Sequence, residues 1–332
     1  MLTQFLSCAR ACIKFALWVS LAHVMQATSK NIWIPDLDEN GVWNWHQNDG
    51  IRQAKRVYGW QEYTGLWHDQ DRNEKGFFSE LNTAESTKSA LKQTSARLGK
   101  PLAADSLGGS PVYISLTSIH NRLYGVTATI DSIITGHVLP SHIYLFLSQD
   151  PFLLDQGVSP DFLHSDTMRD LRAVYRRFPH ISIVFVDNMG PHRKLLPLLA
   201  AKWTEDCVIV TVDDHLLYPP SMLASLLEYD RAAAATSVVA RRARRMGLCS
   251  SSPPWMLAPY TRNRRGLWPE TKPARQEMLM LPTGTGGVLY RPWYFHPVVF
   301  DADLRNATIT GDDLLFRLAT LAKGVPVVTS CR

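Results

Sequence analysis

The stretch Cys-Val-Ile-Val-Thr-Val-Asp-Asp-His at residues 207–215 decides the fold. It begins with a continuous apolar run, which is typical of a strand buried on both faces of a parallel sheet. Its acidic end would then lie at the carboxyl end of that strand, where open α/β sheets bind their ligands. A second acidic cluster, Thr-Gly-Asp-Asp at residues 310–313, precedes a stretch with helical spacing. Together the clusters indicate a metal-dependent enzyme that acts on an anionic substrate.

Apolar runs and helical stretches alternate on both sides of residues 207–215. We expect helices at 124–134, 194–202, 221–235 and 314–321, and strands at 112–116, 142–147, 181–186, 236–240, 287–290 and 325–328. This alternation predicts a mainly parallel sheet flanked by helices. The expected fold class is therefore α/β, with a single Rossmann-like domain at residues 110–332.

The first 109 residues differ from the rest of the chain. Arg10 and Lys14 precede an apolar stretch at 15–27, which predicts a signal peptide or signal anchor within residues 1–30. A buried helix is the alternative, because the stretch is shorter than the ~20 residues of a membrane span. Residues 31–109 are rich in Asn, Gln, Asp and Trp, and we expect a stem or accessory region, or extra layers on the main domain.

A secretory-pathway glycoprotein is the expectation that follows. The leader and the polar stretch resemble the anchor and stem of a Golgi enzyme, which predicts membrane anchoring through the N-terminus and a place in the Golgi membrane or lumen. The Asn-Ala-Thr sequon at Asn306 agrees with this expectation. The net charge of +5 is mild for 332 residues and does not indicate a nucleic-acid partner.

Asp213, Asp214 and His215 are the first candidates for chemistry. Successive strand residues point to opposite faces, so Asp213 and His215 are predicted to share one side and Asp214 to face the other. A carboxylate and an imidazole suit Mn²⁺ better than Ca²⁺, and Mg²⁺ is the alternative ion. Such a metal neutralises a leaving diphosphate. The alternative is a polar strand end that caps the next helix.

Asp312 and Asp313 are the second candidates. A carboxylate beside a metal site can accept the proton of an acceptor hydroxyl as a general base. The alternative is a helix start, where Asp meets the helix dipole favourably. Gly286 and Gly287, in the glycine-rich stretch 283–287, precede a strand and do not form a phosphate-binding loop. They indicate a bulge or a close backbone approach to a substrate.

Five sequence blocks in order carry a family resemblance. They are Ile-Ser-Leu-Thr-Ser at 114–118 with Arg122, Asp-Asn-Met-Gly-Pro at 187–191 with Lys194, Val-Asp-Asp-His at 212–215 with Tyr-Pro at 218–219, Gly-Gly-Val-Leu-Tyr at 286–290, and Gly-Asp-Asp at 311–313. Over residues 111–328 the chain resembles the nucleotide-sugar-dependent glycosyltransferases of the GT-A fold, in the broad family-2-like group.

The resemblance implies a metal-dependent transfer of a sugar to a glycan, protein or lipid hydroxyl, with inversion at the anomeric carbon. It implies Asp313 as the base with Asp312 beside it, and Mn²⁺ or Mg²⁺ at Asp213 and His215. Gly286, Gly287 and Trp255 are the implied acceptor-binding residues, and Trp255 has core packing as its alternative. The implied donor-binding residues are Thr117, Ser118, Arg122, Asp187, Lys194, Asp213 and Asp214.

The sequence departs from the family pattern at two places. His215 stands where Asp is more frequent, and the acidic pair is Asp-Asp rather than Glu-Asp. One alternative is therefore a non-catalytic sugar- or nucleotide-binding protein with a degenerate site. Another is a phosphatase of the haloacid dehalogenase type, which would place its nucleophile after the first strand. The Arg-rich segment 241–275 is predicted to close over donor phosphates, to hold an acidic acceptor, or to be a solvated loop.

Overall fold

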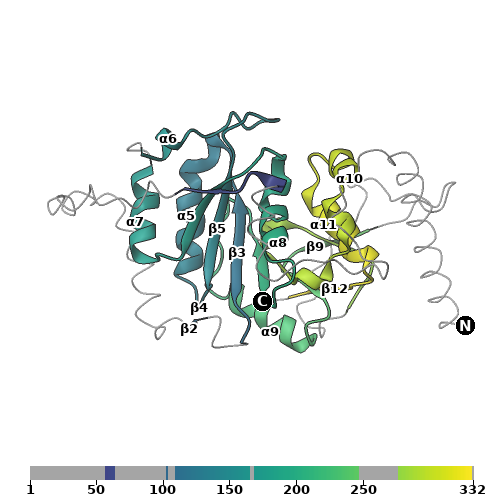
Figure 1. Ribbon diagram of the computed structural model, residues 1–332. Helices are drawn as coiled ribbons and strands as arrows, with labels where there is room; N and C mark the ends of the chain where they lie inside the picture. The colour runs from purple at the N-terminus through teal and green to yellow at the C-terminus, as the bar shows by residue number, and fades with distance from the viewer. Residues whose placement is uncertain (1–56, 64–101, 104–108, 165–167, 247–275, 331–332) are drawn as a thin grey trace, which may run out of the picture.

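A mixed sheet forms the centre of the computed structural model, which describes residues 57–63, 102–103, 109–164, 168–246 and 276–330. Within these residues one sheet has eight strands (Figure 1). Their order is β1 (Gln61–Glu62), β6 (Ile181–Phe185), β5 (His142–Leu147), β3 (Val112–Thr117), β7 (Val208–Thr211), β11 (Val288–Tyr290), β8 (Val238–Ala240) and β12 (Val327–Thr329). The predicted α/β class with a mainly parallel sheet is confirmed.

The strands of the sheet run in two directions. β6, β5, β3 and β7 are parallel neighbours, and β12 is parallel to β8. β11 is antiparallel to both β7 and β8, and β1 is antiparallel to β6. Because β11 runs backwards, its first residue pairs with the last residue of β7, Val288 with Thr211. The start of β11 therefore lies at the edge where β7 ends.

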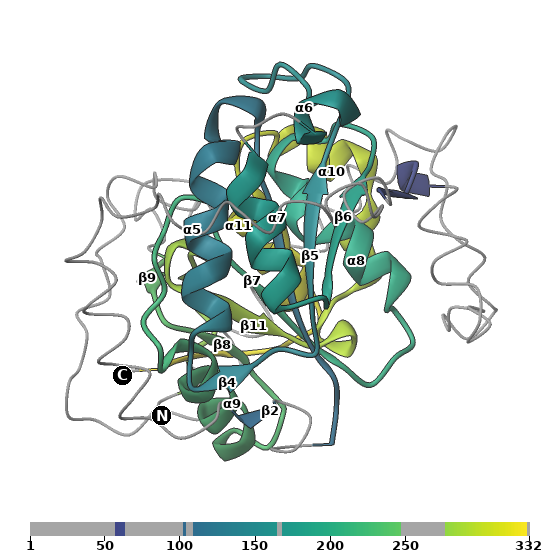
Figure 2. The same cartoon turned by 90° about the vertical axis from the view of Figure 1, so that its left-hand side faces the viewer.

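Helices cover both faces of the sheet (Figure 2). On one face α5 (Leu123–Ile134), α7 (Arg169–Arg177) and α9 (Met222–Ala232) pack with strand residues such as Ile114 and Val210. On the other, α8 (Leu196–Ala201) and α11 (Asp312–Ala322) pack with Phe146 and Ile209. Neighbouring strand residues thus enter opposite cores, which explains the unbroken apolar runs in the sequence.

Shorter elements complete the described structure. They are β2 (Leu102–Ala103), β4 (Val138–Leu139), β9 (Ala243–Arg245), β10 (Met280–Pro282), α6 (Pro160–His164), α10 (Ala302–Ala307), η4 (His120–Arg122), η6 (Gly190–Lys194), η8 (Gly284–Gly286), η9 (Pro292–Tyr294) and η10 (Pro297–Phe300). β2 pairs with β4, and β9 pairs with β10.

The predicted helix 194–202 is divided into two segments. η6 ends at Lys194, and α8 begins at Leu196. Each segment has a proline in its first turn, where the fixed φ favours a helix start and the missing N–H is not needed. α9 ends earlier than predicted, because Ala234 and Ala235 adopt positive φ values of 52° and 53°. α6 and α7 were not among the elements expected.

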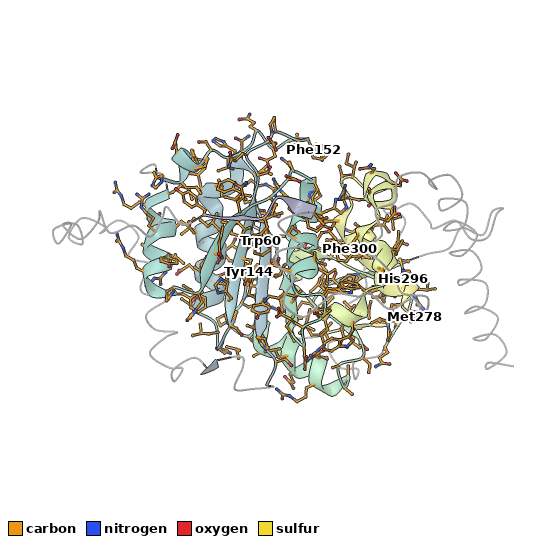
Figure 3. All side chains as sticks on the ribbon, in the orientation of Figure 1. Trp60, Tyr144, Phe152, Met278, His296 and Phe300 are labelled. Carbon is orange, nitrogen blue, oxygen red and sulfur yellow. The ribbon has the colours of Figure 1, made fainter. Side chains whose placement is uncertain are left out.

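Part of the N-terminal region packs onto the main domain. β1 pairs with β6, and Tyr58 and Trp60 are buried. The ring centroids of Trp60 and Tyr144 lie 5.8 Å apart (Figure 3). Residues 57–63 therefore extend the sheet of the main domain by one edge strand, while the division of the chain into a stem or accessory region and a main domain stays a prediction. Residues 1–30 lie outside the described part, in which no helix is long and apolar enough to cross a membrane.

Candidate active site

The candidate site lies at the carboxyl edge of the parallel strands. Thr117 is the last residue of β3, and Ser118 follows it. Asp187 follows β6, and Asp213 follows β7. The reversed strand β11 brings Gly284 to the same edge, since Val288 pairs with the last residue of β7. α11 begins there with Asp312, whose carboxylate meets Lys194 of η6. Segments that are far apart in the sequence therefore supply polar groups to one edge of the sheet.

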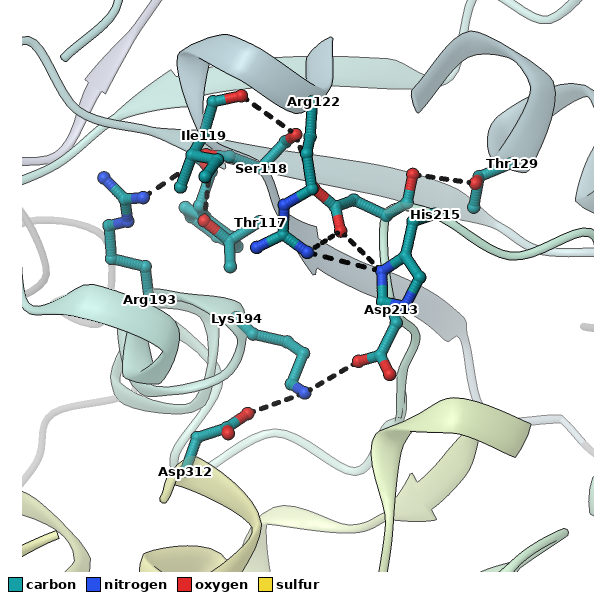
Figure 4. A network of polar contacts seen from close by, with 12 residues as sticks. Thr117, Ser118, Ile119, Arg122, Thr129, Arg193, Lys194, Asp213, His215 and Asp312 are labelled. Carbon is teal, nitrogen blue, oxygen red and sulfur yellow. Dashed lines mark hydrogen bonds and ion pairs between the residues drawn. The ribbon is translucent and has the colours of Figure 1, made fainter. Parts of the chain in front are cut away.

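Lys194 is the centre of the first group of side chains. Its Nζ lies 2.6 Å from Asp312 Oδ2, 3.1 Å from Asp213 Oδ1 and 4.0 Å from Asp313 Oδ1. Figure 4 shows Lys194 between Asp213 and Asp312. One ammonium thus faces three carboxylates that come from two acidic clusters almost one hundred residues apart in the sequence. The two clusters that the sequence singled out form one site.

Gly284 lies directly over this group. Its amide N–H donates to Asp313 Oδ1 and Oδ2, both at 3.2 Å. A Cβ on Gly284 would lie 2.6 Å from Asp213 Oδ1 and 2.7 Å from Lys194 Nζ. These distances are too short for a side chain, so a larger residue would displace the ends of the Asp213 and Lys194 side chains. The glycine-rich stretch was expected to form a bulge or to approach a substrate; Gly284 lies close to the charged side chains, and the approach to a substrate stays a prediction.

Asp214 is the centre of the second group. It accepts hydrogen bonds from Ser118 Oγ at 2.6 Å and from Arg122 Nη1 at 3.2 Å. The Nδ1 of His215 lies 3.1 Å from Asp214 Oδ1 and 3.4 Å from Arg122 Nη1. Asp214 is buried, whereas Arg122 and His215 are about half exposed. The group therefore joins the loop after β3 to the end of β7 and leaves Arg122 partly open to solvent.

The charges of the first group influence the pKa values within it. Burial raises the pKa of Asp313 to about 7, with Lys194 opposing and Asp312 adding to the shift. Burial alone would lower the pKa of Lys194, but Asp312, Asp313 and Asp213 hold it well above its usual value. Lys194 is therefore a permanent cation, and Asp313 is a carboxyl group that exchanges its proton near neutral pH.

The metal prediction for Asp213 and His215 rests on strand alternation, and the strand ends before it reaches them. β7 ends at Thr211, and the Asp213 N–H donates to the Tyr218 hydroxyl at 2.8 Å. Asp213 Oδ1 is engaged by Lys194, while His215 Nδ1 faces Asp214. In this arrangement Asp213 Oδ1 and His215 Nδ1 therefore face other partners and not each other. In the described ranges no group of three or more His, Cys, Asp and Glu side chains is placed to hold a metal ion. Mn²⁺ or Mg²⁺ there stays a prediction.

The other predicted site residues have different surroundings. Thr117 donates to the Phe146 carbonyl at 2.8 Å, inside the sheet. Asp187 lies against Gly59, whose φ is 60° and whose hypothetical Cβ would meet Asp187 Oδ1 at 2.6 Å. Gly286 packs on Arg241, and Gly287 has a φ of 87°. Trp255 lies outside the described residues. These positions stay predictions as donor- or acceptor-binding residues.

A buried ion pair beside the site was not predicted. Arg193 Nη2 lies 2.7 Å from Asp155 Oδ2, and it also donates to the Ser118 carbonyl at 3.3 Å. Asp155 accepts from Asn188 as well. The sequence offered no signal for this pair, because Asp155 belongs to an irregular loop. Gly284 had the signal of a glycine-rich stretch, but the expectation fell on Gly286 and Gly287.

The fold and the site define an α/β protein with a Rossmann-like sheet and an acidic site centred on a lysine. No model of a known protein family matches the sequence, and no curated protein matches it. Among solved structures, the chain is similar to residues 1–349 of S. aureus TarS, a glycosyltransferase, with 13% sequence identity and a TM-score of 0.38. The match covers 67% of this chain and 58% of that one, so the chain spans less than two thirds of the neighbour.

Proposed function

We propose that this protein transfers a sugar from a nucleotide-sugar donor to an acceptor hydroxyl, with inversion of configuration. One observation carries the proposal: the carboxylates of Asp213, Asp312 and Asp313 converge on the buried Lys194 at the carboxyl edge of the sheet. This edge is where open α/β sheets bind nucleotides. The sequence blocks that resemble the GT-A glycosyltransferases contain all four residues and support the same reaction.

Asp313 is the proposed general base. Its pKa of about 7 places it between its neutral and charged forms at neutral pH, as an efficient base requires. The hydrogen bonds from the Gly284 amide orient the carboxylate. The acceptor oxygen forms a bond to the anomeric carbon, and its proton passes to Asp313. The bond between the anomeric carbon and the diphosphate oxygen breaks, and its electron pair leaves with the diphosphate.

Cationic groups of this chain meet the leaving diphosphate. Lys194 is buried among the carboxylates, and Arg122 is half exposed beside Asp214. Fixed charges of this kind stabilise a transition state in which negative charge develops, because they need no reorganisation during the reaction. A phosphatase of the haloacid dehalogenase type would instead place its carboxylate nucleophile after the first strand of the domain, whereas Asp213 follows β7.

Hydrolysis and transfer assays with a panel of nucleotide sugars test this function. The unmodified chain is expected to release nucleoside diphosphate from at least one donor, and Asp213→Ala to release less. Asp303→Asn is the matched control, because Asp303 is an exposed carboxylate in the first turn of α10. If no donor binds and none turns over, the function is wrong. Binding without turnover would favour the non-catalytic reading instead.

The secretory location is proposed as well. Asn306, the glycosylation sequon residue, is exposed on α10 and is accessible to modification. A full-length tagged protein is expected to enter the secretory pathway and to lose mass on deglycosylation. The variant Asn306→Gln should have the mass of the deglycosylated form. Cytosolic staining of the full-length protein would contradict this location.

A further inference from the structure

A diphosphate at this edge needs a cation, because three converging carboxylates repel it. Arg122 and Lys194 are cationic side chains at this edge that pair with its carboxylates. Arg122 is 48% exposed and is paired with the single carboxylate of Asp214. Lys194 is 7% exposed and faces three carboxylates. Lys194 therefore occupies the most negative position in the site.

The ammonium of Lys194 stands where a divalent cation would have to bind the carboxylates. Mn²⁺ or Mg²⁺ would require carboxylate oxygens at about 2.0–2.2 Å, with geometry close to octahedral. Asp312 Oδ2 and Asp213 Oδ1 instead lie 2.6 Å and 3.1 Å from the Lys194 Nζ, at hydrogen-bond distance. A metal ion bound to these two oxygens would lie against the ammonium, and the like charges would repel. The two cations therefore compete for one position.

Gly284 encloses the ammonium from a third direction. The site of a Cβ on this residue lies 2.7 Å from Lys194 Nζ and 2.6 Å from Asp213 Oδ1, so the backbone is packed against the ion pair. The amide of Gly284 also holds Asp313. The backbone of Gly284 and the carboxylates together surround the lysine ammonium. The fold therefore holds this side chain in one defined, buried position.

We propose that Lys194 takes the place of the divalent cation and offsets the negative charge of the carboxylates that would otherwise repel the diphosphate. The role toward a donor rests on the proposed function. The competition between Lys194 and a metal ion does not, because it follows from the distances alone. The site is then expected to work in the presence of a chelator.

Titration with Mn²⁺ alone, followed by the electron paramagnetic resonance signal of the free ion, tests the competition. The full chain is expected to show no saturable binding in the micromolar range. Lys194→Ala should bind Mn²⁺ about tenfold or more tightly than the unmodified protein, because Asp213 and Asp312 lose the ammonium that lies between them. Adding Asp312→Asn to Lys194→Ala should remove that binding. Micromolar Mn²⁺ binding by the unmodified chain, unchanged in Lys194→Ala, would overturn the proposal.

Binding of inorganic pyrophosphate in EDTA tests the role toward the diphosphate. The unmodified chain is expected to bind it with the same affinity in EDTA and in Mn²⁺. Lys194→Met should weaken it about tenfold, as one lost charged contact predicts, and Lys194→Arg should keep most of it. Lys323→Met, at an exposed lysine after α11, is the matched control. Pyrophosphate binding that requires Mn²⁺ would contradict the proposal.

The two experiments separate the two proposals. A chain that excludes Mn²⁺ and binds pyrophosphate in EDTA, but turns over no nucleotide sugar, would contradict only the proposed function. A chain that turns over a nucleotide sugar only with Mn²⁺ would contradict only the role of Lys194. If circular dichroism shows that Lys194→Ala is unfolded, the two measurements on the unmodified chain decide the question.

Discussion

Arg193 and Lys194 are neighbours in η6, and both are buried cations with very different partners. Arg193 pairs with Asp155, and the two side chains are 1% and 2% exposed. Lys194 faces three carboxylates that are 14–29% exposed. The first pair is balanced in charge and closed to solvent, as a structural contact requires. The second is unbalanced, with three carboxylates around one ammonium, and its carboxylates are less closed to solvent.

The Arg193 pair joins the loops around the site. Arg193 reaches the Ser118 carbonyl after β3, Asp155 lies after β5, and Asn188 after β6 donates to Asp155. The ends of three parallel strands are thereby tied together. These contacts hold the loops around the site together, beside Lys194 and its carboxylates. Adjacent residues thus have different tasks, which the predictions below test.

The largest effect on turnover is expected at Asp313, one of the three carboxylates around Lys194. Asp313→Asn removes the proposed base and should lower turnover by about 100- to 10,000-fold, while donor affinity changes little. The measurement is single-turnover transfer to an acceptor, with the anomeric configuration of the product read by NMR. Asp303→Asn is the control at an exposed carboxylate. Turnover equal to that of the unmodified chain would remove Asp313 from the mechanism.

The closed pair is expected to affect stability instead. Arg193→Met leaves Asp155 buried without its cation, which should lower the free energy of unfolding by about 3–5 kcal/mol. The exposed pair of Arg177 and Asp131 provides the control. Arg177→Met should change the free energy of unfolding by about 0–1 kcal/mol. Chemical denaturation measures both. Equal effects of the two variants would show that burial does not distinguish these pairs.

A smaller effect is expected for the hydrogen bond between Ser118 and Asp214. Ser118→Ala removes a donor to a buried carboxylate, which should cost about 1.5–3 kcal/mol of unfolding free energy. Ser221→Ala is the control, because Ser221 starts α9 without a capping hydrogen bond from its side chain. Thermal denaturation compares the two. If the two variants have the same melting temperature, the hydrogen bond between Ser118 and Asp214 does not stabilise the loop after β3.

The smallest effect on turnover is its dependence on pH. Asp313 must be ionised to accept a proton, so turnover should rise roughly tenfold between about pH 6 and about pH 8. Stability should change in the opposite direction. Because the folded pKa is raised from 3.8 to about 7, the stability it contributes is present below about pH 4 and is lost as the pH rises through 7. Any residual turnover of Asp313→Asn should lack this rise.

The fold was largely predictable from the sequence, because strands buried on both faces leave unbroken apolar runs such as residues 208–211. The convergence of Asp213 and Asp312 was predictable in outline. The first cluster follows a buried strand and the second begins a helix, and both of these ends lie at one edge of the sheet. The side chains that these two residues contact were not predictable from the sequence. Whether Asp213 meets His215 or Lys194 depends on where β7 ends, and Tyr218 determines the turn that follows. The buried Arg193 left no pattern at all.

The two-residue strand β1 has a consequence for handling this protein. It covers the outer edge of β6, and the buried rings of Tyr58 and Trp60 precede it. A fragment that starts at residue 110 would uncover the backbone of β6 and the aromatic surface of Tyr144 and Phe146, which contact Trp60. An uncovered strand edge is a template for pairing between chains. Such a fragment should aggregate, whereas one that begins before residue 57 should stay monodisperse in gel filtration.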